Sequence, residues 1–209
     1  MLDRRGQSPL AVLTDAIATG MPVLALCADV PRRLPGLADR VGGFTLVSYG
    51  ELGREPQFVD RFAQLVALDP PAAPEEQALL ERGDGYAQLA WGPAELRFAE
   101  QMHELEYGLR ASLVALYRSL RERQRATGEE LERLLRGDGP HGRSVQLAGR
   151  LIRVLAELEL VSLDRNLPTL AIAGTAPTAL ERSPSFRVYA KRYEDGKRFL
   201  SSANPPPSG

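Results

Sequence analysis

The sequence predicts an α/β domain followed by a mostly helical domain, and two stretches carry this prediction. Pro22 to Ala28 is a continuous apolar run, typical of a strand buried on both faces of a parallel sheet. Ser144 to Ile172 begins with apolar residues at helical spacing and ends with two short apolar runs around a polar turn, which indicates a helix followed by a β-hairpin. We therefore expect a Rossmann-like parallel sheet, then a winged-helix domain and a C-terminal helix.

The alternation of short apolar runs with helical segments supports the parallel sheet in residues 1–104. Because the sequence opens in what looks like the end of a strand, we expect it to begin inside a larger protein. The expected elements are a strand ending at Leu2-Asp3, a helix Leu10–Ala18 opened by Ser8 or Pro9, the strand Pro22–Ala28, a helical or irregular segment Arg32–Val41, strands Phe44–Ser48 and Gln64–Leu68, a helix Glu75–Glu81, a turn Gly83–Gly85 and a strand Tyr86–Trp91.

Helical periodicity dominates the second expected domain, residues 105–201, and residues 202–209 are expected to form a disordered tail. The hairpin follows the helix from Ser144, with its turn at Asp164 to Asn166. The expected helices are Pro93–Leu105, Tyr107–Arg123 with a leucine stripe, Leu131–Arg136 with Thr127 and Glu130 as a capping box, the helix from Ser144, and a last helix from Ser183-Pro184 to about Ser201.

Composition places the chain among ordinary globular proteins, with 44% hydrophobic and 25% charged residues. One cysteine excludes an internal disulfide framework, and two histidines with one cysteine cannot complete a zinc site. The first residues show no signal-peptide pattern, and no apolar run reaches the length of a membrane span. We expect a cytoplasmic protein with no membrane partner.

Charge is distributed unevenly along the chain. Residues 1–104 carry 9 Arg against 15 Asp and Glu, whereas residues 105–209 carry 17 Lys and Arg against 12 Asp and Glu. A partner with phosphate groups would therefore prefer the second half.

Three predicted strands end in aspartate, at Leu2-Asp3, Ala28-Asp29 and Leu68-Asp69, and ligands bind at the carboxyl edge of open parallel sheets. One interpretation is a metal site of paired carboxylates. The other, which we favour, is loop capping and pairing with nearby arginines such as Arg32 and Arg33, at an edge that packs on a neighbouring domain. The dense Asp/His cluster of a two-metal nuclease is missing. Asp29, Arg32, Arg33 and Asp69 are the candidate docking or ligand edge.

Other chemical signals are weak. Gly137 to Ser144 spells GDGPHGRS, close to a phosphate loop, but Arg143 replaces the lysine and a predicted helix precedes it, so we interpret Ser144 as a helix N-cap. His103 and His141 belong to no nucleophile motif, and Cys27 falls in a buried strand. We predict no catalytic residue and no metal ligand.

A candidate nucleic-acid surface lies on the helix from Ser144. Opposite its leucines it carries Gln146, Arg150, Arg153 and Glu157, a face that a winged helix would place against DNA, and Arg165 at the hairpin tip would touch phosphate. Glu157 favours a plain solvated face, and winged helices also bind proteins, so both interpretations stay open.

The last helix is basic with interleaved aromatic residues, which suits single-stranded nucleic acid. However, Phe186, Tyr189 and Tyr193 recur at i, i+3 and i+7, the spacing of a stripe that packs on a core, and we favour core packing.

Four segments are informative through their order and spacing: ALDPP (67–71), LVALYRSLR (113–121), RVLAELELV (153–161) and LERSPSFRVY (180–189). In this order they resemble the C-terminal region of bacterial RecJ-type single-stranded-DNA-specific exonucleases. The resemblance runs from about Leu2 to Leu200.

The resemblance implies a role without catalysis. That family hydrolyses single-stranded DNA from 5′ to 3′ with metal ions held by an Asp-His-His domain and a companion domain, and neither motif occurs here. It implies no cofactor in this chain, with Mn²⁺ or Mg²⁺ bound only by the other domains of the parent nuclease. The implied partners are single-stranded DNA and repair proteins such as single-strand-binding protein or a helicase. The alternative is a free-standing winged-helix transcription regulator, which would dimerise and prefer duplex DNA, and whose α/β part would sense a small ligand.

Overall fold

The computed structural model describes residues 1–82, 86–137, 141–164 and 166–203. The predicted turn at 83–85 and the part of the predicted tail from 204 onwards lie outside the described residues. In the described part of the chain, no helix is both long and apolar enough to cross a membrane.

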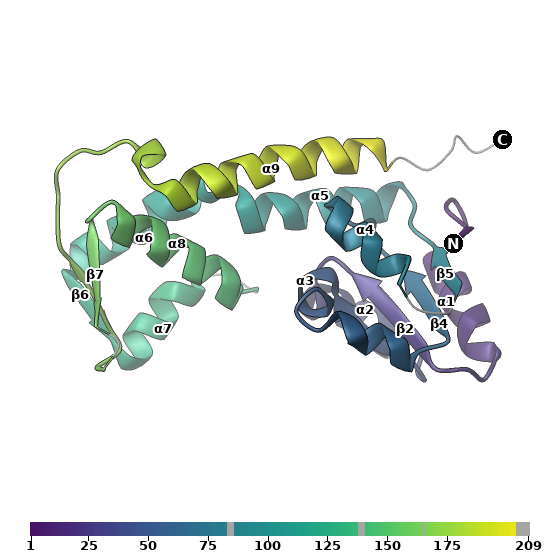
Figure 1. The fold of residues 1–209 in the computed structure, drawn as a ribbon. Coiled ribbons are helices and arrows are strands. Elements are labelled where there is room, and N and C mark those ends of the chain that lie inside the picture. Colours follow the sequence, from purple (N-terminus) through teal and green to yellow (C-terminus); the bar gives the residue numbers. More distant parts are fainter. Residues whose placement is uncertain (83–85, 138–140, 165, 204–209) are drawn as a thin grey trace. The chain divides into compact units, whose positions relative to one another are not determined.

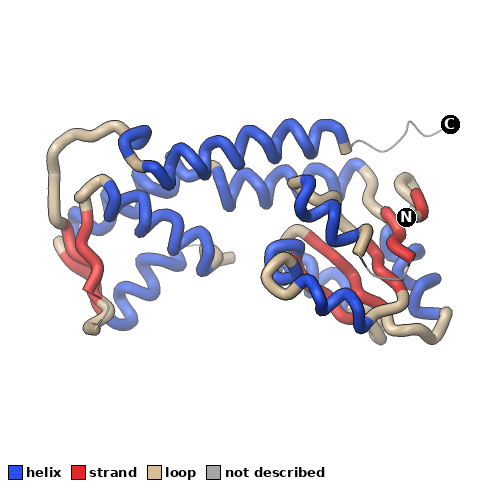
Figure 2. The backbone as a smooth tube through the Cα atoms, in the orientation of Figure 1, coloured by secondary structure: helices blue, strands red, loops and turns tan. Residues whose placement is uncertain are grey.

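The chain forms two compact units, Met1–His103 with Asp195–Gly209, and Glu104–Glu194. It leaves the first unit within helix α5 (Pro93–Tyr107) and returns within helix α9 (Pro184–Ser202) (Figure 1). The whole last helix was predicted to belong to the second domain, whereas its final part packs in the first unit. Strands of the two units form two separate sheets (Figure 2).

The sheet of the first unit is parallel, as predicted, with strand order β1-β5-β4-β2-β3. Ala25 in β2 lies opposite Leu46 on one side and Val66 on the other, which places β2 between two neighbours. The all-apolar sequence of β2 follows from this position, because both faces of a central strand are covered. The strands are β1 (Leu2–Asp3), β2 (Val23–Cys27), β3 (Thr45–Ser48), β4 (Gln64–Ala67) and β5 (Tyr86–Leu89).

Successive side chains of β2 point to opposite faces of the sheet and into two different cores. Val23 and Ala25 pack with α1 and α2, and Leu24 and Leu26 pack with α3, η1 and α4. Helices therefore cover both faces. Their bounds are α1 (Pro9–Ala18), α2 (Val30–Ala38), α3 (Tyr49–Leu52), the 3₁₀ helix η1 (Pro56–Arg61) and α4 (Pro74–Leu80).

The carboxyl edge of this sheet is covered by α5 and by the end of α9. The indole Nε1–H of Trp91 donates to the Ala203 carbonyl at 3.0 Å. A small apolar cluster joins both helices to the ends of β2 and β4; it contains Leu96 and Ala99 of α5, Leu200 of α9, and Ala28, Ala72 and Ala203.

In the second unit, helices pack against a three-stranded antiparallel sheet of order β6-β8-β7. Leucines of α6 and α8 form the centre of its core, and Phe186 of α9 joins them, as its spacing predicted. The elements are α6 (Leu109–Arg123), β6 (Arg125–Thr127), α7 (Gly128–Arg136), α8 (Val145–Glu157), β7 (Val161–Asp164), β8 (Thr169–Ile172) and η2 (Leu180–Arg182).

Two local details differ from the sequence analysis. Strand β6 was not predicted; it begins just after Gln124, whose φ of 67° ends α6 and redirects the chain. The predicted capping box before α7 is wrong, because the Thr127 side chain makes no hydrogen bond at the helix start. The predicted hairpin is confirmed, since β7 and β8 pair with Val161 opposite Ile172.

Candidate functional site

Each of the three aspartates at the carboxyl edge of the first unit is paired with an arginine. Asp3 bonds Arg5 and Asp29 bonds Arg32, each at 2.7 Å between carboxylate oxygen and guanidinium nitrogen. Asp69 forms an ion pair with Arg33. Asp29 also caps α2, accepting the Arg32 backbone N–H at 2.8 Å. This is the capping and pairing that the sequence analysis preferred to a metal site.

Asp69 is fully buried and its oxygens are occupied. Its carboxylate accepts the Ala28 N–H at 2.9 Å and the Arg33 Nε–H at 3.1 Å, and its backbone carbonyl accepts the Tyr49 hydroxyl at 2.7 Å. The Arg33 guanidinium lies 4.1 Å from the centre of the Phe98 ring, on α5. Burial raises the pKa of the Asp69 carboxyl, and the hydrogen bond from Arg33 opposes that shift. The cluster joins the ends of β2 and β4 to α2 and α5.

Cys27 ends β2 beside this cluster and is buried. Burial, with the nearby Asp69 charge, raises the pKa of its thiol far above the usual value, so the thiol stays protonated and unreactive at neutral pH. Among the described residues, no three or more His, Cys, Asp and Glu side chains gather closely enough to hold a metal ion.

Arg150 does not lie on the exposed face of α8, where the sequence analysis placed it. Its side chain is only 17% exposed and forms an ion pair with Glu106. It also donates to the Glu106 carbonyl at 3.0 Å and lies over the Tyr107 and Tyr189 rings. Arg150 therefore ties α8 to the end of α5 and to α9, and we remove it from the candidate contacts with nucleic acid.

Glu157 also has a structural role. It accepts hydrogen bonds from the Ser183 and Ser185 hydroxyls and, at 3.0 Å, from the Ser185 N–H. Ser183 in turn accepts the Phe186 N–H at 3.0 Å and so caps the first turn of α9. Slight burial raises the pKa of Glu157, but these hydrogen bonds outweigh it, and the pKa lies below its ordinary value.

Two predicted contacts of α8 remain exposed, Gln146 and Arg153. Arg165, predicted to touch phosphate from the hairpin tip, lies outside the described residues. Gln146 and Arg153 project from the same helix as the buried Leu147, Leu151 and Val154 and turn away from the core that these form.

The loop before α8 is structural where it is described. The Ser144 hydroxyl accepts the Leu147 N–H at 2.9 Å, which makes Ser144 the N-cap that the sequence analysis expected. Arg143 donates to the Leu134 and Leu135 carbonyls at 3.1 and 3.4 Å, at the end of α7. The arginine that replaces the phosphate-loop lysine thus supports a helix end. Residues 138–140 of the loop lie outside the described residues.

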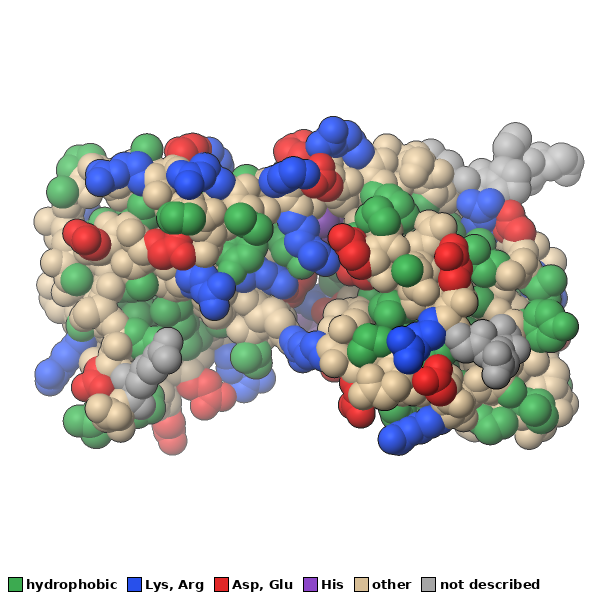
Figure 3. All heavy atoms as spheres, viewed as in Figure 1, with side chains coloured by type: hydrophobic (Ala, Val, Ile, Leu, Met, Phe, Trp, Pro, Cys, Tyr) green, Lys and Arg blue, Asp and Glu red, His purple; other side chains and the backbone are tan. Residues whose placement is uncertain are grey.

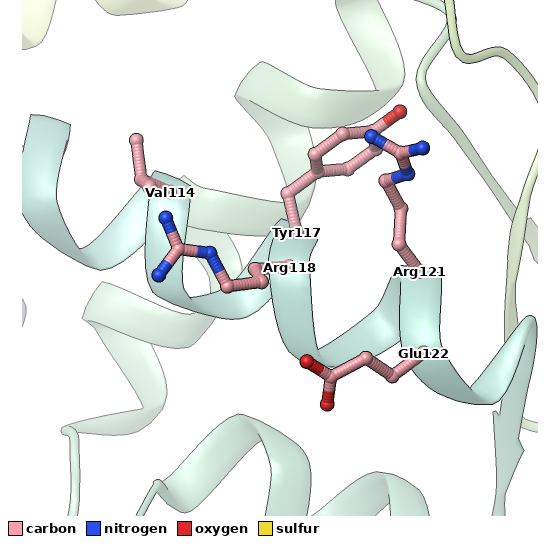
Figure 4. Close-up of a pocket in the computed structure, with 5 residues that line it drawn as sticks. All are labelled: Val114, Tyr117, Arg118, Arg121 and Glu122. Atoms are coloured by element: carbon pink, nitrogen blue, oxygen red, sulfur yellow. The ribbon is translucent and has the colours of Figure 1, made fainter.

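A shallow hollow of about 420 Å³ lies on the outer side of α6 (Figure 4). This hollow was not predicted, although two arginines three residues apart and opposite the leucine stripe were a usable signal in the sequence. Side chains of both charge signs are interspersed over the face of the molecule shown in Figure 3. A site for an anion therefore depends on a local pair of arginines rather than on the overall charge. The hollow is lined by Val114, Tyr117, Arg118, Arg121 and Glu122.

A comparison of the chain with known protein families, with curated proteins and with solved structures finds no match.

Proposed function

We propose that the chain is a non-catalytic nucleic-acid-binding module, the accessory C-terminal region of a RecJ-like 5′-to-3′ single-stranded-DNA exonuclease. The observation that carries this proposal is the order of elements in the second unit. Helix α6, strand β6, helices α7 and α8, and the β7–β8 hairpin follow one another, and β6 pairs with the hairpin. This order supports a winged helix, in which α8 would be the helix presented to nucleic acid.

The exposed side of α8 suits close approach to a nucleic-acid backbone. Gln146 and Arg153 can donate hydrogen bonds from it, while Gly149 and Ala156, also exposed, add almost no side-chain bulk. The excess of basic residues in the second half of the sequence supports the same choice of partner.

In this proposal the first unit is a scaffold. Its carboxyl edge, where a parallel sheet would bind a ligand, is covered by α5 and α9 and neutralised by Asp–Arg pairs. Hydrolysis would belong to other domains of the parent nuclease, with their Mn²⁺ or Mg²⁺, in the cytoplasm.

A second candidate function, docking of a repair protein, is favoured by the hairpin. Leu167 in its turn is 72% exposed, and Leu163 in β7, four residues earlier, is 40% exposed. Exposed leucines close together are typical of protein-binding surfaces, and single-strand-binding protein or a helicase would be the partner.

The test is a low-salt titration of the whole chain against fluorescein-labelled single-stranded and duplex DNA, followed by anisotropy, with cleavage monitored in manganese. We expect single-strand preference, no cleavage, and an affinity that falls with salt by about 0.7 log units per log unit for each phosphate bound. Arg153→Gln should weaken binding, whereas Arg82→Gln, at an exposed ion pair of the first unit, should not.

Each other outcome points elsewhere. Failure to bind either DNA would rule out the nucleic-acid function and leave protein docking. Preference for duplex by a dimer would favour the free-standing winged-helix regulator. Cleavage in manganese would refute the non-catalytic role.

A further inference from the structure

We infer that the hollow on α6 is a second nucleic-acid contact, in which Arg118 and Arg121 bind backbone phosphates of a single strand. The inference rests on the proposed function and extends it, because the hollow belongs to a different helix from the face of α8 described above. A phosphodiester is the ligand class, and the two guanidinium groups are its donors.

The arginines of α6 divide into two kinds. Arg110 forms an ion pair with Glu181, and Arg123 pairs with Glu130 at 3.3 Å. Arg118 and Arg121 are exposed and make no side-chain hydrogen bond or ion pair with the residues that the structure describes. Only the second kind has its full donor set available to an anion.

The spacing of these two arginines places both on one side of the helix. Residues three apart in a helix are neighbours on its surface. Arg118 and Arg121 both line the hollow, and Figure 4 shows Arg121 extending beside the Tyr117 ring. In Figure 4 the Arg118 guanidinium points toward Val114 and away from that of Arg121, an arrangement that suits two successive phosphates.

Tyr117 gives the hollow a fixed wall. Its hydroxyl donates to the Gly174 carbonyl at 2.7 Å, and its ring packs against the core of the second unit. Because the hydroxyl is tied down, the ring is held in place beside Arg121. A held aromatic ring and the half-exposed Val114 offer apolar contact to a sugar or base that follows the phosphate.

Glu122 weakens the site for any anion. Its carboxylate also lines the hollow, although Figure 4 shows it pointing to the other side of α6 from Tyr117 and Arg121. Glu122 repels a doubly charged free phosphate more than a phosphodiester, but the two arginines also attract it more, so competition with inorganic phosphate has to distinguish the two. An acidic peptide would need an apolar pocket for an anchoring side chain, and the lining of this hollow comes from one helix and includes one aliphatic residue.

The experiment compares variants of the whole chain by anisotropy of a fluorescein-labelled oligodeoxythymidylate at several salt concentrations. We expect Arg118→Gln with Arg121→Gln to weaken binding about ten-fold or more and to reduce the salt slope by about 0.7 for each phosphate that is no longer bound. Arg133→Gln with Arg136→Gln, on the exposed side of α7, removes the same charge from the same unit and should have little effect. Glu122→Gln should tighten binding.

A further variant protects the test against a folding artefact. Arg118→Lys with Arg121→Lys keeps the charge and loses the planar forks, so its affinity should lie between those of the wild type and the glutamine variant. Circular dichroism should be unchanged for the α6 and α7 pairs, because all four side chains are exposed.

Several results would overturn the inference. If the α6 and α7 double variants lose the same amount of DNA affinity, binding depends on general charge alone, and the proposed function stands without this site. If the α6 double variant binds DNA as tightly as the wild type, the conclusion is the same. If millimolar inorganic phosphate or polyglutamate displaces DNA from the wild type but not from the Arg118→Gln, Arg121→Gln variant, the site binds free phosphate or acidic peptide. If the wild type binds no DNA, the proposed function fails together with the inference.

Discussion

His103 in α5 packs so closely against Gly196 in α9 that a Cβ atom on Gly196 would clash with Cε1 of the imidazole. Both residues belong to the first unit, and the histidine is buried. The glycine is required by space rather than by its backbone angles, because it lies in a regular helix and its φ is not positive. The contact brings α9 against α5 just where the chain re-enters the first unit.

Gly196→Ala is therefore expected to destabilise the first unit, by about 1–3 kcal/mol, since the buried ring has to move to admit the methyl group. Urea unfolding followed by fluorescence measures this, because Trp91 is the only tryptophan of the chain and lies in that unit. Gly149→Ala is the matched control: that glycine is exposed in α8 with nothing near its missing Cβ, and alanine there should stabilise the second unit by up to about 1 kcal/mol, measured by circular dichroism because Trp91 lies in the first unit. Combining Gly196→Ala with His103→Ala should recover part of the loss, and strict additivity would contradict the proposed clash.

Asp69→Asn is expected to cost about 3 kcal/mol of unfolding free energy. The substitution keeps the shape of the side chain but removes the charge that neutralises Arg33. Asp60→Asn, in an exposed ion pair with Arg82 at 3.5 Å, should cost less than about 1 kcal/mol. Equal effects in the two variants, measured by urea unfolding, would show that the buried pair is no more important than a surface one.

Arg150→Ala and Arg153→Ala should separate stability from binding. Loss of Arg150 removes its bonds to Glu106 and should destabilise the second unit by about 2 kcal/mol, measured by circular dichroism during thermal unfolding. Arg153 is exposed, and its loss should leave the melting temperature unchanged while weakening DNA binding. The reverse pattern would return Arg150 to the nucleic-acid surface and remove Arg153 from it.

Glu157→Gln should destabilise the protein by about 1 kcal/mol at neutral pH, the usual cost of a lost helix cap. The folded pKa of Glu157 is lowered, so the carboxylate contributes stability above its unfolded pKa and loses it as the pH falls through the folded value. The difference between the two proteins should thus be full at pH 7 and shrink below about pH 4.5. A difference independent of pH would mean that Glu157 acts through packing rather than charge.

Local patterns were sufficient to predict most of the elements. The apolar run of β2, the leucine stripe of α6 and the paired runs of the hairpin each carry their signal within a few neighbouring residues. Strand β6 is three residues long and has no periodicity of its own, because β8 defines it through pairing. The 3₁₀ helix η1 was missed for the same reason, since its one buried residue, Val59, leaves no pattern.

The candidate site was harder to predict because helical periodicity describes one helix at a time. It separated Arg150 from the leucines of α8 correctly, but it contained no information about Glu106 and Tyr107, which reach the same face from α5. The aspartates after the strands were placed at the right edge, and their pairing with nearby arginines followed from sequence proximity except for Arg33, which lies 36 residues from Asp69. Spacing alone places the two arginines that line the hollow on one face of α6, but only the structure shows that the other two arginines of that helix are paired with glutamates.

The first unit is built from two separate stretches of the chain, and this affects the order in which the two units fold during synthesis. Residues 104–194 form the second unit without interruption, whereas the first unit lacks Leu200 and the partner of Trp91 until the ribosome has translated everything in between. The second unit would then fold before the first. This reverses the usual order, in which the N-terminal domain of a nascent chain folds first. A nascent chain of which residues 1–194 have left the ribosome contains every segment of the second unit, whereas the first unit still lacks the end of α9.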